Sequence, residues 1–165
     1  MNLDLRGEIM PDWLAHIFFA YILCKIAELK LDTFRRGENV ALVIVGSLLP
    51  DLVKIALIFD LAKIYVWDFI KPLHTPIGSL LVAALMSLAF YNWRTTFLLL
   101  TLGFLSHYAL DMTLGHVSGG MLLLFPFSWN KYQLGLIHSD DFRITLILGV
   151  IALVVYLTDR AKSQI

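Results

Sequence analysis

The stretch Ser106-His107-Tyr108-Ala109-Leu110-Asp111-Met112-Thr113 decides how this sequence is interpreted. His107 and Asp111 are four residues apart, so on an α-helix both side chains project from one face, one turn apart. A helix can present an imidazole and a carboxylate to one divalent ion in this way, and Zn²⁺ is the usual guest of such ligands. The pair lies in the apolar run 95–114, where ionisable side chains are costly and indicate a functional site. In a soluble helix the same spacing more often gives a solvated or salt-bridged pair, so the pair alone is weak evidence for a metal site. A metal site also needs further ligands from elsewhere in the chain.

The composition is more apolar than that of an ordinary soluble domain. The chain has 165 residues, of which 59% are hydrophobic and 16% are charged, and this length predicts one domain over residues 1–165. Thirteen basic and thirteen acidic side chains cancel, so no electrostatic field attracts nucleic acid. A single cysteine, Cys24, excludes an intramolecular disulfide.

Hydrophobic runs predict five membrane helices, over residues 13–29, 40–59, 76–91, 95–114 and 143–158. Pro50 is expected to kink the second helix, and Thr75-Pro76 is typical of a helix start. The segment 60–73 mixes charged and aromatic residues, which favours the bilayer interface. Glycines and a proline interrupt the connection 115–141, so it cannot form a helix that spans the membrane. A re-entrant or interface-docked hairpin is expected there instead. The fold class is therefore all-α, a polytopic membrane bundle in an integral, multi-pass membrane protein.

Alternating helix directions bring many polar residues to one membrane face. They are His16, Asp51, His74, His107, Asp111, His116 and His138, which include every histidine of the chain. Asp51 lies behind a kinking proline inside a hydrophobic helix, which is an unusual place for a carboxylate. A metal centre therefore becomes a better interpretation than polar residues that only pair to pack helices.

Three short elements resemble a known family. They are Gly46-Ser47-Leu48-Leu49-Pro50-Asp51, then Leu73-His74-Thr75-Pro76, then the run from Gly103 to Thr113. In this order they resemble the YdjM-like inner-membrane-associated proteins, a family regarded as metal-dependent hydrolases. That family is similar in turn to the zinc-dependent phospholipase C and P1 nuclease superfamily of all-helical enzymes.

The resemblance implies a set of metal ligands: His16, Asp51, His74, His107 and Asp111, with Asp111 as a bridge between two ions. His116 and His138 could stand in for two further histidines of the soluble enzymes. The sequence departs from many relatives at Val53, where they carry a second aspartate. We expect two divalent ions, most simply zinc, although manganese or iron would also suit these ligands.

The expected activity is hydrolysis of a phosphoester of a lipid or lipid-linked substrate at the membrane surface. Asp51 is expected as a ligand, and the sequence leaves open whether it also accepts a proton as the catalytic base. Trp67, Trp129 and Tyr132 would hold lipid head groups. Lys54, one turn from Asp51, either balances phosphate charge or, more commonly for such a lysine, extends to the interface. The alternative is a divalent-metal transporter or a metal-binding membrane protein without hydrolase activity. The sequence predicts membrane lipid as a partner, identifies no protein partner and leaves the membrane orientation open.

Overall fold

The computed structural model describes residues 12–55, 59, 62–66, 70–115, 119–138 and 142–162. Its α-helices are α1 (Asp12–Glu28), α2 (Gly37–Leu48), α5 (Pro76–Ser87), α6 (Trp93–Thr113) and α7 (Phe142–Lys162). Short 3₁₀ helices are η2 (Asp32–Arg35), η3 (Pro50–Ile55) and η4 (Lys71–His74), and the strands are β1 (Leu114–Gly115) and β2 (Ile137–His138). The predicted all-α class is confirmed for the described residues, since the strands have two residues each.

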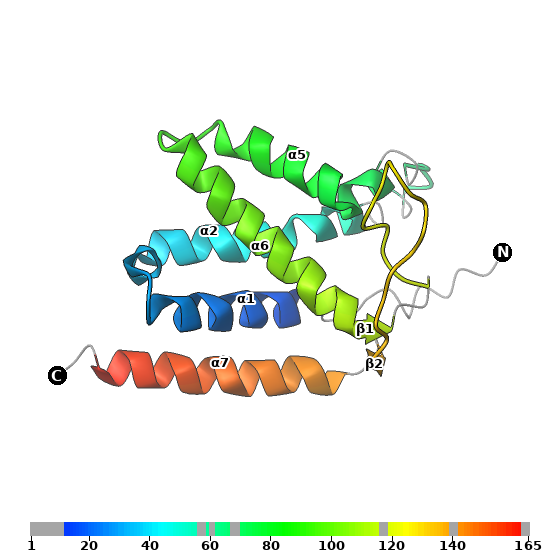
Figure 1. The fold of residues 1–165 in the computed structure, drawn as a ribbon. Coiled ribbons are helices and arrows are strands. Elements are labelled where there is room, and N and C mark those ends of the chain that lie inside the picture. Colours follow the sequence, from blue (N-terminus) through cyan, green and yellow to red (C-terminus); the bar gives the residue numbers. More distant parts are fainter. Residues whose placement is uncertain are drawn as a thin grey trace.

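Successive helices alternate in direction, as the sequence analysis assumed (Figure 1). α6 crosses α2, α5 packs on α6, and α7 lies beside α1. This arrangement brings the starts of α1, α5 and α7 to the same end of the bundle as the ends of α2 and α6 (Figure 1). That end is where the sequence analysis expected the polar residues to meet.

The first and fourth helices agree with the hydrophobic runs to within two residues, whereas the fifth ends at Lys162, four residues beyond its predicted end. The predicted helix over 40–59 was wrong, because α2 ends at Leu48 and the 3₁₀ helix η3 begins at Pro50. A proline has no backbone N–H to donate and blocks an α-helix there, so the chain changes to a tighter turn. The third helix ends at Ser87 rather than at residue 91.

Two glycines set the close crossing of α2 and α6. A Cβ atom on Gly103 would lie 2.6 Å from the backbone nitrogen of Ser47 and would overlap the carbonyl of Val43. A Cβ atom on Gly46 would likewise overlap the backbone of Leu100. Only glycine at both positions lets the two backbones touch, which is the packing mode of helices in membranes.

The described part of the bundle buries many polar side chains beside its apolar core and exposes many large apolar ones. The buried polar residues are His16, Ser47, Asp51, Thr75, Ser79, Ser87, Thr96, Ser106, His107, Asp111 and Thr145. α7 shows the outer side clearly, since Thr145 and Ala152 are its buried residues and its large apolar side chains are mostly exposed. The outer surface therefore carries more large apolar side chains than a typical soluble domain exposes, although large apolar residues such as Leu100 and Phe104 are also buried.

Among the described helices, α7 alone is long and apolar enough to cross a membrane on those two criteria. α2 and α5 have 12 residues each, or about 18 Å of helix, against the ~30 Å of a hydrocarbon core. The polytopic arrangement therefore stays a prediction.

The connection after α6 folds over the same end of the bundle (Figure 1). β1 and β2 pair in parallel, and Met121 forms an antiparallel bridge with Tyr132. The Leu134 N–H donates to the Met112 carbonyl, which ties the returning chain to the last turn of α6. The hairpin predicted here is present in the described residues 119–138, whereas its depth in a membrane is not tested.

Candidate metal centre

Four elements deliver the five predicted ligands to one place. His16 comes from α1, Asp51 from η3, His74 from η4, and His107 and Asp111 from α6. Four of these residues are at most 4% exposed, and only the His74 side chain, at 26%, reaches the surface. The convergence that the sequence predicted is therefore present, and its open side is at η4.

A backbone carbonyl orients the His107 ring. Its Nδ1 lies 2.8 Å from the carbonyl oxygen of Ser47, so Nδ1 carries the proton and donates it. The other nitrogen, Nε2, then presents a lone pair 3.0 Å from Oδ2 of Asp111. A lone pair this close to a carboxylate oxygen is repulsive, and either a second proton on the ring or a cation between the two atoms relieves it.

The His16 ring is stacked on that of His107. Their centroids are 3.7 Å apart and the planes differ by 17°, so two imidazolium charges here would repel strongly. His16 Nε2 lies 3.2 Å from Oδ1 of Asp111. Among the described residues, neither His16 Nδ1 nor His107 Nε2 has a hydrogen-bond partner. Buried nitrogens without partners are rare, and a metal ion is one way to satisfy them.

The turn that carries His74 is fixed to the start of α5. Thr75 caps this helix, since its Oγ1 accepts from the Gly78 N–H at 3.2 Å. Ser79 donates to the Leu73 carbonyl at 3.0 Å, and its Oγ lies 2.8 Å from the Tyr108 hydroxyl. Through these bonds α5 and α6 together hold the backbone on either side of His74.

The electrostatic surroundings keep His74 in its ligating form. Burial lowers the pKa of His74, and the neighbouring His107 lowers it further. The imidazole is therefore neutral at pH 7, which is the state that binds a metal ion. Its Nε2 lies 3.6 Å from Oδ2 of Asp111 and 3.9 Å from Oδ1 of Asp51.

Asp51 has a basic neighbour at the open side. Lys54 Nζ lies 2.9 Å from Oδ2 of Asp51 and 5.9 Å from the centroid of the Trp13 ring. A lysine at this position more commonly extends to the interface, whereas the structure places the Lys54 ammonium group at the ligand cluster. The lysine charge offsets one of the two carboxylates, so a divalent ion would find one unbalanced negative charge among these groups.

Two overlapping groups of ligand atoms are close enough to bind a metal ion. One consists of His16, Asp51 and His107, and the other of His74, His107 and Asp111; in each, the atoms lie within 4.8 Å of one another. His107 offers a single nitrogen, because the Ser47 carbonyl occupies the other. Two ions held together would therefore need a carboxylate bridge, and Asp111 has an oxygen near each of His16 and His107.

The other predicted contributors lie elsewhere or were not described. His138 is exposed on β2 and joins neither ligand group. His116, Trp67 and the side chain of Val53 lie outside the described residues. Trp129 is exposed, as a head-group contact requires, and Tyr132 is partly buried.

Sequence reasoning missed the backbone partner of His107 and the hydrogen bond between Ser79 and Tyr108. A carbonyl partner leaves no signature in a sequence. The i, i+29 spacing of the serine and tyrosine also follows no local pattern.

Fold and site together define an all-helical protein with a buried histidine and aspartate cluster at one end of its bundle. The sequence matches the family of YdjM inner membrane proteins over residues 10–164, and the chain belongs to this family. It is therefore an inner membrane protein by family. No curated protein and no solved structure matches it significantly.

Proposed function

We propose that this chain is a multi-pass, membrane-embedded metal-dependent hydrolase that cleaves a phosphoester of a lipid or lipid-linked substrate at the membrane surface. The observation that carries the proposal is the cluster itself. Five ligand side chains from four elements converge, and two of their buried nitrogens have no hydrogen-bond partner among the described residues. Three imidazoles and two carboxylates are a donor set that suits zinc, manganese or iron.

The multi-pass arrangement is supported by the apolar exterior and by the polar groups buried among the helices. Leucines such as Leu81, Leu85 and Leu98, which are 60%, 61% and 64% exposed, are typical of a surface that another apolar phase covers. In a bilayer the same arrangement satisfies the polar groups internally and presents apolar groups to lipid.

The residues of the site have separable roles in this proposal. His16, His74, His107 and Asp111 bind the metal, and the Ser47 carbonyl keeps His107 in the correct tautomer. When bound, a divalent ion supplies a Lewis acid for the phosphoryl group and lowers the pKa of water. Asp51 binds the ion and accepts the proton of the attacking water. Lys54, beside Asp51 at the open side, balances the charge of the substrate phosphate.

The position of the cluster favours a hydrolase over a transporter. His16 is the fifth residue of α1 and Asp111 is two residues before the end of α6, so the site is near one end of the bundle. Transport sites tend to lie near the bilayer midplane with access from both sides. Within the described ranges, both candidate metal groups belong to this one cluster, so no second site marks a path across the bundle.

The test is elemental analysis of detergent-purified wild type beside the double variant His107→Ala/Asp111→Ala. His138→Ala is the matched control, because it removes an exposed imidazole outside the cluster. We expect at least one equivalent of metal in the wild type and in the control, and its loss in the double variant.

A metal-loaded wild type is then screened against phospholipids and lipid phosphates, and for metal uptake in proteoliposomes. Hydrolysis supports the proposal, whereas uptake without hydrolysis supports the transporter. If the wild type stayed metal-free after reconstitution with each ion, both the hydrolase and the transporter interpretations would be refuted.

A further inference from the structure

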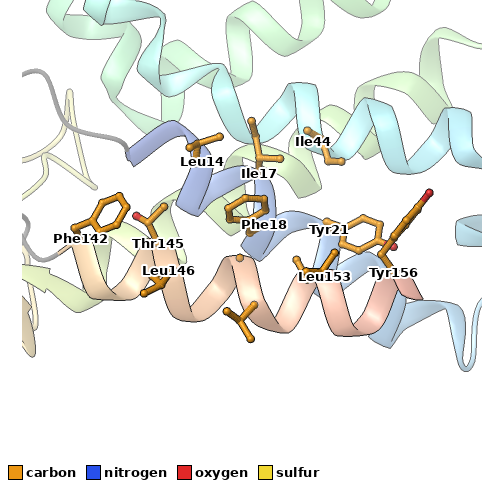
Figure 2. Close-up of a pocket in the computed structure, with 13 residues that line it drawn as sticks. Leu14, Ile17, Phe18, Tyr21, Ile44, Phe142, Thr145, Leu146, Leu153 and Tyr156 are labelled. Atoms are coloured by element: carbon orange, nitrogen blue, oxygen red, sulfur yellow. The ribbon is translucent and has the colours of Figure 1, made fainter. Parts of the chain in front are cut away.

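A cavity lies between α1 and α7, and none of the five metal ligands lines it. It encloses about 610 Å³ and is open along one side. Leu14, Ile17, Phe18 and Tyr21 form its α1 wall, and their i, i+3, i+4, i+7 spacing places them on one helix face. In Figure 2, Phe18 and Tyr21 lie next to α7, and Leu14 and Ile17 lie farther from it.

The groove has different chemistry at its two ends. Leu14 and Phe142 lie at the end near the metal cluster, whereas Tyr21 and Tyr156 lie together at the far end (Figure 2). Just beyond them, Lys25 of α1 pairs with Glu28 and with Asp159 of α7. The walls are mostly apolar. The Thr145 hydroxyl lies near Phe142, whereas both tyrosine hydroxyls and the Lys25 ion pairs lie at the far end.

We propose that this groove binds one acyl chain of a glycerophospholipid whose head group lies at the Tyr21–Tyr156 end. Tyrosine at the end of an apolar wall is typical of the membrane interface, where the ring contacts hydrocarbon and the hydroxyl contacts the head group. The chain belongs to an inner membrane family, and α7 is apolar enough to cross a bilayer. α1 runs beside α7, so a bilayer crossed by α7 surrounds the groove too.

The size of the groove fits a lipid chain better than a protein helix. From Phe142 to Tyr156 it runs along fifteen residues of α7, or about 21 Å, which exceeds the ~15 Å hydrocarbon depth of one leaflet and so can take the full length of one chain. A helix about 10 Å wide and equally long would occupy roughly 1,600 Å³. The groove volume is instead within the ~300–1,000 Å³ of pockets for small ligands.

Gly149 lines the groove at the middle of α7 and leaves space there because it has no side chain. A Cβ atom there would lie 3.1 Å from the Phe18 ring, so a larger side chain would occupy the space that the lipid chain needs. Ile147, two residues earlier, is 58% exposed and does not line the groove. Gly149→Leu and Ile147→Leu therefore form a matched pair, in which one change fills the groove and the other leaves it open.

The experiment is native mass spectrometry of the full chain in detergent, titrated with palmitoyl-oleoyl phosphatidylethanolamine. We expect one lipid to stay bound to the wild type and to Ile147→Leu. Gly149→Leu should bind about tenfold more weakly, because excluding about two methylene groups costs roughly that factor. The double variant Tyr21→Phe/Tyr156→Phe should weaken binding about fivefold through lost hydrogen bonds to the head group.

Several outcomes would overturn this proposal. Equal lipid binding by Gly149→Leu and wild type would show that the lipid lies elsewhere, and an unchanged affinity in the tyrosine double variant would refute the head-group position. A wild-type dimer that Gly149→Leu dissociates, without lipid, would make a second copy of the chain the occupant. Far-UV circular dichroism checks folding; should Gly149→Leu be unfolded, Val150→Phe narrows the groove from its rim and replaces it. Because none of the five metal ligands lines the groove, the proposed hydrolase can fail without affecting this result.

Discussion

Replacing Gly103 with alanine tests whether the contact between α2 and α6 holds the metal cluster together. In an exposed helix this substitution stabilises, because alanine has the higher helix propensity by ~1 kcal/mol. Here the added Cβ would lie 2.6 Å from the Ser47 nitrogen and would overlap the Val43 carbonyl. Neither is a flexible side chain, so the two helices must move apart.

The structure allows the magnitude to be worked out. Overpacking of this kind costs about 1–3 kcal/mol. Moving α2 away also stretches the 2.8 Å contact between His107 Nδ1 and the Ser47 carbonyl, a further loss of about 1 kcal/mol. After the propensity gain of ~1 kcal/mol is subtracted, the net loss of stability is about 1–3 kcal/mol. For a chain of this size, each kcal/mol lowers Tm by roughly 2–4 °C.

The assay is thermal unfolding in detergent by circular dichroism, with metal content measured on the same samples. Gly37→Ala is the control, because it adds the same methyl group at the start of α2 with nothing within 4 Å. We expect Gly37→Ala to be neutral or stabilising, and Gly103→Ala to lose both stability and bound metal. A Gly103→Ala protein as stable and as metal-rich as the wild type would refute the reasoning, because it would mean that the close crossing is not required.

Three further substitutions separate the parts of the site. His107→Asn keeps an amide donor near the Ser47 carbonyl but lacks the second ring nitrogen, so the variant should fold without binding metal. Elemental analysis measures the metal content, and retained metal would exclude His107 as a ligand. Lys54→Gln removes a cation 2.9 Å from a ligand carboxylate, so the zinc affinity measured by chelator competition should rise about fivefold, which corresponds to the ~1 kcal/mol of a partly exposed ion pair. The control Lys71→Gln changes an exposed lysine and should leave the zinc affinity unchanged. A lower zinc affinity in Lys54→Gln would contradict the charge balance. Tyr108→Phe deletes the hydroxyl that reaches the start of α5 and should weaken metal binding by at least about tenfold, with little change in helix content; an unchanged zinc affinity would mean that this hydroxyl does not position the site.

The sequence predicted the shared position of the ligands better than their individual environments. The i, i+4 spacing of His107 and Asp111 and the alternation of helices were enough to bring His16, Asp51 and His74 to the same end of the bundle. These predictions depend on helix periodicity and on direction, and both can be derived from a hydrophobic pattern.

The details that make the cluster chemically distinctive were not predictable. The stacking of His16 on His107 depends on the crossing of α1 and α6, and sequence spacing does not encode this angle. Lys54 was assigned to the interface because most lysines near helix ends extend there. The end of α2 at Leu48 shows a similar limit, since a proline can either kink or end a helix, and packing decides which occurs.

The distribution of side chains in this bundle also predicts how the chain tolerates substitution. Positions on its outer surface, such as Leu85 and Val154, should exchange freely among large apolar residues and reject charged ones. Interior positions such as Ser79 and Gly103 should reject even one added methyl group. Under the proposed multi-pass arrangement, a saturation mutagenesis map of this chain would thus differ from that of a soluble protein mainly on the surface, where apolar side chains are accepted and charged ones are not, while the interior restricts size in both.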